Sequence, residues 1–294
     1  MKAVLLLAHG APENLAEVED FILRIRHGRP LSPELLAGIK ERYRLAGGSP
    51  LLHWTERQAA GLQQRLRECG KPHDVFIGMR YSRPFIHETI ESILARGASS
   101  LVVVCMAPQF SGRSIGAYKK ALEEAIAGRA IEFHLVQSYG SHLKLIEAFA
   151  EKLRQAQQQH PHAFVLFTAH SLPQSVLQQQ DPYDSEVKET ARLVAQTVHL
   201  QDWSFAYQSQ GLTQEPWLGP NVEDVINDLA AKGVNEIIVA PIGFVCDHVE
   251  ILYDIDILYR NHAAEQGIAL YRTASLNDSC EFIDLLFSLV VERL

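Results

Sequence analysis

Cysteine is scarce in this chain, and its few cysteines are not spaced to bind a metal cluster. Cys69, Cys105, Cys246 and Cys280 lie far apart, and no pair has the Cys-x-x-Cys spacing of zinc or iron–sulfur sites. Reduced thiols in a cytoplasmic protein are therefore the default expectation. We predict no iron–sulfur cluster and no tightly bound cofactor.

Long apolar runs are missing as well. No stretch reaches the roughly 18 uninterrupted apolar residues that a membrane span requires. The apolar run at 3–8 is too short for the core of a signal peptide. We therefore expect no transmembrane segment and a cytoplasmic location.

Basic residues are outnumbered by acidic ones. The chain has 27 lysines and arginines against 35 aspartates and glutamates, a net charge of −8. Such a surface repels polyphosphate at long range, so nucleic acid is not an expected partner. Apolar residues at 47% and charged residues at 21% are ordinary for a globular protein, and 294 residues suffice for two domains or one large α/β domain.

Short β-branched and leucine-rich runs alternate with longer segments of helical periodicity, which predicts βαβ units and a mostly parallel sheet. Strands are predicted at 3–7, 75–79, 101–105, 132–136, 164–168, 205–208, 236–240 and 268–271. Helices are predicted at 55–68, 85–96, 117–127, 143–158, 185–197, 222–232 and 278–294.

The chain also contains a weak internal repeat. Ala8-His9 closes the first predicted strand, and Ala169-His170 closes an equally apolar strand later in the chain. The segment 85–97 with the apolar run after it resembles the segment 222–233 with its own following run. The repeat predicts two similar, doubly wound, Rossmann-like halves, 1–140 and 141–294, with an insertion in the first half at about 26–50.

Ligands of open α/β sheets bind outside the carboxyl ends of the strands. Both repeat histidines follow such ends, so two facing halves would enclose a cleft with one histidine on each side. A ligand with two faces fits that cleft.

Three segments, together with the turn that carries Trp217, are candidates for chemistry. His170 leaves a strand end in Thr-Ala-His-Ser-Leu-Pro, where it is either a metal ligand or base, or a loop histidine bonded to local carbonyls. Glu250 and Asp254, four residues apart, share one helix face, so they are either a proton or cation site, or acids placed at a helix start. Trp217 is either a ligand wall or core.

The third candidate is the insertion. Its arginines, among them Arg26, Arg42 and Arg44, are followed by Gly47-Gly48-Ser49. Guanidinium binds carboxylate in a bidentate manner, so these arginines favour a ligand with carboxylates. A solvated charged helix is the alternative.

Taken together, these segments and their order along the chain resemble the ferrochelatase family, whose members insert ferrous iron into a porphyrin. The resemblance covers nearly the whole chain. It rests on Thr-Ala-His-Ser-Leu-Pro at 168–173, on Gln208-Ser209 with the Trp-Leu-Gly-Pro turn at 217–220, and on Asp-His-x-Glu-x-Leu-Tyr at 247–253.

The resemblance implies parallel sheets facing a porphyrin cleft, with iron as a substrate that passes between His170 and Glu250. Those two residues would share the roles of metal ligand and base for the two pyrrole protons, and Asp254 would carry protons out. The porphyrin contacts implied by position are His9, Arg26, Arg42, Tyr43, Ser49, Tyr118, Ser209 and Trp217.

The insertion resembles that of the soluble bacterial enzymes, whose substrate is coproporphyrin III, and four propionates suit its arginines. Two departures stand out: His9 replaces the usual tyrosine, and Leu258 replaces an acid that would extend the row of Glu250 and Asp254. The chain is also one residue short near 42–49, so Arg44 is an alternative to Arg42.

Two rival functions stay open. A chelatase for cobalt or nickel with another tetrapyrrole also has a His-Gly pair after the first strand, as at His9-Gly10, but lacks the Trp-Leu-Gly-Pro turn. A carrier of haem or metal on the same fold, without catalysis, is the alternative from another class.

Overall fold

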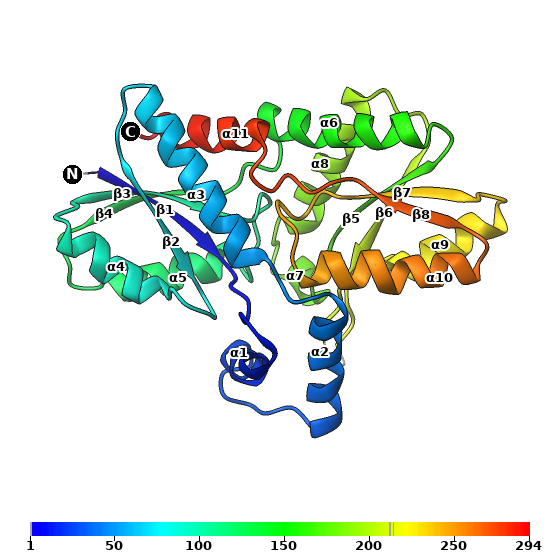
Figure 1. Cartoon of the computed structure of the whole chain (residues 1–294), viewed down its shortest axis with the longest axis horizontal. Helices are drawn as coiled ribbons and strands as arrows, with labels where there is room; N and C mark the ends of the chain where they lie inside the picture. Colours follow the sequence, from blue (N-terminus) through cyan, green and yellow to red (C-terminus); the bar gives the residue numbers. More distant parts are fainter. Residues whose placement is uncertain (1, 212, 214) are drawn as a thin grey trace.

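Two parallel four-stranded sheets form the framework of the protein (Figure 1). The computed structural model describes residues 2–211, 213 and 215–294. The first sheet has the order β2 (Asp74–Met79), β1 (Lys2–Ala8), β3 (Ser100–Cys105) and β4 (Glu132–Val136). The second has the order β6 (Trp203–Gln208), β5 (Phe164–His170), β7 (Glu236–Pro241) and β8 (Ala269–Arg272). The predicted α/β class and its duplicated parallel halves are confirmed, and every predicted strand is present.

The central strands explain why these runs are so apolar. In β1, Leu5 pairs with Phe76 on one side and Val103 on the other. In β5, Phe167 pairs in the same way with Phe205 and Ala240. Strands in the middle of a parallel sheet are covered on both faces, so they need continuous rather than alternating apolar sequence.

Helices cover both faces of each sheet. With the inserted helices η1, α1 and α2 included, the helices are η1 (Leu15–Glu17), α1 (Val18–Ile25), α2 (Pro33–Leu45), α3 (Leu51–Glu68), α4 (Ile86–Ala95), α5 (Ile115–Ile126), α6 (Leu143–Gln159), α7 (Ser175–Gln178), α8 (Tyr183–Thr197), α9 (Val222–Ala231), η2 (Glu250–Tyr259), α10 (Arg260–Glu265) and α11 (Cys280–Val291). The lower faces in Figure 1 have separate cores, one between the first sheet and α4 and α5, and one between the second sheet and α9, η2 and α10.

The upper faces share one core. Val4 and Leu66 of the first half belong to the same buried cluster as Phe167 and Leu285. Helix α11 follows the second sheet in the chain but packs against α3 and β3, as Figure 1 shows at the upper left. This crossing joins the halves on one side of the molecule. The division of the chain at residues 140 and 141 stays a prediction.

The inserted segment is helical. Helices α1 and α2 project from the side of the molecule opposite α3, α11 and α6 (Figure 1). Helix α2 begins where Ser32 accepts a hydrogen bond from the backbone N–H of Leu35 at 3.3 Å, with Pro33 in the first turn. A serine cap followed by proline is a typical helix start, so sequence could have predicted this helix. Among the described residues, no helix is both long and apolar enough to cross a membrane.

Candidate functional site

His170 is the last residue of β5, and its backbone and ring are both held in place. Its carbonyl accepts a hydrogen bond from the hydroxyl of Tyr183 at 2.8 Å. Ring atom Nδ1 contacts the carbonyl of Ser171. This arrangement leaves Nε2 to face the carboxylate of Glu250 at 3.6 Å.

Glu250 lies between two imidazoles. Its Oε2 is 3.6 Å from Nε2 of His170 and 3.6 Å from Nε2 of His248. Burial alone would favour the neutral acid, but the two histidines hold the pKa of Glu250 well below its ordinary value. Burial likewise opposes charge on His170, yet the Glu250 carboxylate raises the pKa of His170. The site therefore keeps an anionic carboxylate beside imidazole at neutral pH.

His248 was not singled out from the sequence, although it lies within the 247–253 motif. Its Nδ1 is 3.0 Å from the carbonyl of Cys246, and its ring packs against Phe244 at 4.5 Å between centroids. The residue is buried. Its place two residues before Glu250 was the available signal, but helical spacing would put the two side chains on different faces.

Asp254 is a second carboxyl group next to this cluster. It is buried, and the Ser209 hydroxyl donates a hydrogen bond to Oδ2. Burial and then the charge of Glu250 raise the pKa of Asp254 to about 6, while Arg42 and His170 act in the opposite direction. Asp254 can therefore exchange protons close to neutral pH.

Hydrogen bonds join the strand ends to the helix that carries these acids. Ser209 has a positive φ of 59°, and its backbone N–H donates to the hydroxyl of Tyr259 at 3.2 Å. The amide of Gln208 donates to the carbonyl of Glu250 at 3.4 Å and accepts from the Thr168 hydroxyl at 2.7 Å. The backbone strain at Ser209 thus has a structural reason, because it brings the hydroxyl to Asp254.

The segment with Glu250 and Asp254, predicted as an ordinary helix, is the π-helix η2 over Glu250–Tyr259. The backbone N–H of Arg260 donates to the carbonyl of Ile255, the five-residue step of that helix type. Runs of this length are rare, and short π segments are frequent at functional sites. Apolar spacing did not distinguish it from an α-helix.

His9 approaches this cluster from the first half. It follows β1, and its ring lies at the edge of Tyr81, 4.8 Å between centroids, and of Phe21, 5.9 Å away. Part of the residue is exposed to solvent, but protein surrounds the imidazole ring. The resulting loss of hydration lowers the pKa of His9 to about 4. The charges of Glu250, Arg80, His170 and His248 also act on it, so the repeat histidines share one electrostatic environment.

Some residues of helix α2 lie near this cluster, and others point away from it. Tyr43 is buried and feels the charge of Glu250, which together with burial raises the pKa of Tyr43. The Arg42 guanidinium lies 5.6 Å from the ring of Tyr253. Arg44 instead forms two hydrogen bonds with Glu41, at 2.7 and 2.6 Å. Of the two arginines, Arg42 is the one toward the site.

Ser49 connects the insertion to the start of η2. Its hydroxyl accepts a hydrogen bond from the backbone N–H of Val249 at 3.3 Å. Tyr118 is buried in the first half, where the charge of Glu250 reaches it. Arg26 donates to the carbonyl of Arg29 at 3.0 Å within its own loop.

Trp217 lies in the loop after β6, where its indole N–H donates to the carbonyl of Thr213 at 3.3 Å. Its backbone lies against the segment that follows His170, where the Trp217 carbonyl accepts a hydrogen bond from the Gln174 amide at 3.0 Å and Trp217 bridges to Pro173. Among the described residues, no hydrogen bond or ion pair joins the side chains of Trp217 or Arg26 to those of His170, Glu250 or Asp254.

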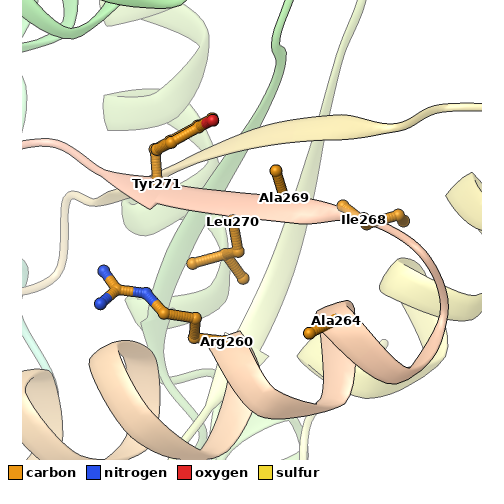
Figure 2. A pocket seen from close by; sticks show the side chains of 6 residues that line it. All are labelled: Arg260, Ala264, Ile268, Ala269, Leu270 and Tyr271. Atoms are coloured by element: carbon orange, nitrogen blue, oxygen red, sulfur yellow. The ribbon is translucent and has the colours of Figure 1, made fainter.

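Two hollows of the described surface lie away from this cluster. One of about 430 Å³ lies between α10 and β8, and Figure 2 shows its six lining side chains, Arg260, Ala264, Ile268, Ala269, Leu270 and Tyr271. A second, of about 280 Å³, is lined in part by Arg80, Phe85 and Glu124. Neither includes His170 or Glu250, so the porphyrin cleft stays a prediction. No group of three or more His, Cys, Asp or Glu side chains in the described ranges is arranged to hold a metal.

The fold is that of the tetrapyrrole chelatases. SirB from Bacillus subtilis with Fe3+ superimposes with a TM-score of 0.64 over 99% of this chain and 94% of its own, at 13% identity. CbiX, described as the terminal enzyme of sirohaem biosynthesis in denitrifying bacteria, gives 0.59 over 99% of both chains at 13% identity. At such low identity, the likeness shows the fold alone.

Sequence comparison identifies the family. The Ferrochelatase family model matches residues 1–294. A ferrochelatase of Herpetosiphon aurantiacus is 41% identical, covering 98% of this chain and 97% of its own, and a coproporphyrin III ferrochelatase of Halalkalibacterium halodurans is 36% identical, covering 99% and 96%. The chain belongs to the ferrochelatase family, a family of lyases, and its reaction is the insertion of iron into a porphyrin. The relatives named here favour iron over the cobalt or nickel rival.

Proposed function

We propose that this ferrochelatase acts on coproporphyrin III and that His170 and Glu250 receive the ferrous iron. The observation that carries the assignment of residues is the position of the Glu250 carboxylate, 3.6 Å from each of two imidazoles and next to the titratable Asp254. Carboxylate and imidazole are both suitable ligands for ferrous iron, and a pair of them holds it weakly enough to pass it on.

Iron insertion requires the porphyrin to lose two pyrrole protons. The unprotonated fraction of His170 accepts the two protons one after the other, and the anionic Glu250 next to it stabilises the imidazolium that forms each time. Asp254, with its pKa near 6, takes each proton from His170 in turn and passes it out of the cluster. The Ser209 hydroxyl, which donates to Asp254, stabilises the charged carboxylate between turnovers.

The choice of coproporphyrin III rests on charge around α2. Arg42 lies toward the site without an acidic partner among the described residues, whereas Arg44 is occupied by Glu41. A substrate with four propionates matches such a free guanidinium, and Arg26 at the end of α1 is a second candidate contact. Four curated relatives at 31–36% identity are named coproporphyrin III ferrochelatases.

We further propose His9, Tyr43, Ser49, Tyr118, Ser209 and Trp217 as porphyrin contacts. Iron is the substrate, and we propose neither a tightly bound cofactor nor an iron–sulfur cluster, in line with the wide separation of the four cysteines. The cytoplasm is the compartment we propose.

An anaerobic assay with ferrous iron tests the proposal. Coproporphyrin III should change from its free absorption spectrum to that of the metalloporphyrin with repeated turnover. Binding without a spectral change would indicate a carrier. Turnover with cobalt or nickel and sirohydrochlorin, but not with iron and a porphyrin, would support the rival chelatase.

A further inference from the structure

A buried arginine lies behind the site. Arg272, the last residue of β8, has 14% of its side chain exposed and bonds to two aspartates. Its Nε and Nη2 donate to the two carboxylate oxygens of Asp256 at 2.9 and 3.0 Å. Its Nη1 is 3.2 Å from the carboxylate of Asp247.

The two aspartates flank the functional residues in sequence. Asp247 directly precedes His248, and Asp256 belongs to η2, the helix that begins with Glu250 and carries Asp254. One guanidinium therefore fixes both the loop that presents His248 and the helix that presents the two carboxylates. On the side of the helix that faces the site, the Ser209 hydroxyl donates a hydrogen bond to Asp254 and also holds η2 in place.

The loop after β8 completes this arrangement. The Ser275 hydroxyl donates to Asp247 at 2.7 Å, and the Asn277 amide donates to its other oxygen at 2.9 Å. The carbonyl of Asn277 accepts from Gln58 of α3 at 2.8 Å, so the network reaches the first half. Arg260 of α10 is a second cation near Asp256, with its Nη2 3.7 Å from the Asp256 carboxylate.

The ion pairs of Arg272 with Asp247 and Asp256 differ from the exposed ion pairs on the surface of the protein. Both carboxylates are about four-fifths buried, at 19% and 21% exposed, and the guanidinium fork meets Asp256 in a bidentate manner. Such geometry gives directional precision, and removing the cation would leave two carboxylates buried close together. A π-helix is an uncommon conformation that persists only where its surroundings hold it.

We propose that Arg272 is a positioning residue for iron insertion, which sets the distance of Glu250 from His170 and His248 by holding Asp247 and Asp256 together. The proposal rests on the role proposed for Glu250. The proposal requires no contact between Arg272 and the substrate. Arg272 acts through the loop that carries His248 and through η2.

The test compares Arg272→Lys and Asp256→Asn with the parent and with Arg65→Lys. Arg65 also pairs with an aspartate, Asp284 at 2.8 Å, but on α3 and away from the site. Each protein is assayed anaerobically with ferrous iron and coproporphyrin III, or with protoporphyrin IX if that is the porphyrin turned over. Circular dichroism and thermal melting report the folded fraction.

For Arg272→Lys we expect kcat per folded molecule to fall about tenfold or more, since displacement of a catalytic group by about 1 Å can cost up to a hundredfold. Asp256→Asn should show the same effect in smaller measure, and Arg65→Lys should match the parent. The KM for porphyrin should change by less than about threefold, because the porphyrin contacts are untouched. The acid limb of the kcat profile should also move to lower pH, because loosening η2 lets water reach Asp254.

Three outcomes separate the hypotheses. A loss that merely follows the folded fraction, with an unmoved pH profile, would assign Arg272 a structural role and overturn the proposal. Parental kcat in Arg272→Lys and Asp256→Asn, with Glu250→Gln inactive, would overturn it while leaving the role of Glu250 intact. Parental kcat in Glu250→Gln would reject the role of Glu250 itself.

Discussion

The Nε2 atom of His170, the last residue of β5, lies 3.6 Å from the carboxylate of Glu250, the first residue of η2. The two residues come from segments of the second half that are distant in sequence. Their approach gives an imidazole with a raised pKa next to a carboxylate with a lowered pKa. This pairing produces the first prediction.

His170→Ala should abolish iron insertion, with a loss in kcat of at least about a hundredfold, because it removes the residue that we propose as both metal ligand and base. Porphyrin should still bind, since the walls of the site remain. Fluorescence quenching of the porphyrin measures binding, and the absorption assay measures turnover. His262→Ala, on α10, is the control. Activity within a few fold of the parent would show that His170 is not the metal-site histidine.

Glu250 and Asp254 should contribute unequally. Glu250→Gln removes the charge that lies between His170 and His248, so we expect a strong fall in kcat. Asp254→Asn should cost less, because it removes a group that relays protons and leaves the metal site in place. Steady-state kinetics of both variants at one pH decide the order. Equal and small effects would mean that these acids only complement the start of a helix.

The pH dependence should report Asp254. As a proton acceptor it must be charged, so kcat should fall as the pH drops through about 6, the pKa to which burial and Glu250 raise this group. The limb should vanish in Asp254→Asn and persist in His262→Ala. A profile of unchanged shape in Asp254→Asn would assign the limb to another group.

Asp254 should also reduce stability at neutral pH. Its pKa is about 6 in the folded protein against 3.8 ordinarily, so the folded state binds the proton more tightly and stability falls as the pH rises between those values. Asp254→Asn avoids this cost and should raise the free energy of unfolding at pH 7 by about 1–3 kcal/mol. At pH 3 the gain should disappear. Urea unfolding at both pH values measures it, and equal stability at pH 7 would contradict it.

Much of the framework was predictable because burial leaves a simple pattern. Continuous apolar runs such as those around Leu5 and Phe167 predict central parallel strands, and the repeat predicts that His9 and His170 follow equivalent strands. A helix in the insertion was expected only as an alternative, a solvated charged helix, although Ser32 and Pro33 mark the start of α2.

The geometry of the site was less predictable because it depends on contacts between distant segments. Ser49 meets Val249, and Arg272 meets Asp247, through tertiary packing that no local pattern encodes. The π-helix has the same apolar residues as an α-helix would, so spacing alone cannot distinguish the two. His248 lies just before the helix begins at Val249, so helical spacing does not apply to it, and its ring lies on the same side as the Glu250 carboxylate.

We also predict a substrate preference from Arg42 on α2, whose guanidinium has no acidic partner within the part of the chain that the structure describes. Coproporphyrin III has two more propionates than protoporphyrin IX, and one charge-assisted hydrogen bond contributes about 1.5–3 kcal/mol before ordering costs. Even the lower end corresponds to about a tenfold difference in affinity. We therefore expect a higher kcat/KM for coproporphyrin III, with a gap that narrows as salt screens the arginines.

Variants of the arginines locate that preference. Arg42→Ala, and to a smaller extent Arg26→Ala, should narrow the gap between the two porphyrins, because each removes a partner for a propionate. Arg44→Ala should leave it unchanged, because Arg44 is held by Glu41 on the exposed face of α2. Steady-state assays with both porphyrins in matched detergent measure the ratio. A preference for protoporphyrin IX that neither Arg42→Ala nor Arg26→Ala alters would show that the insertion does not select the substrate by charge.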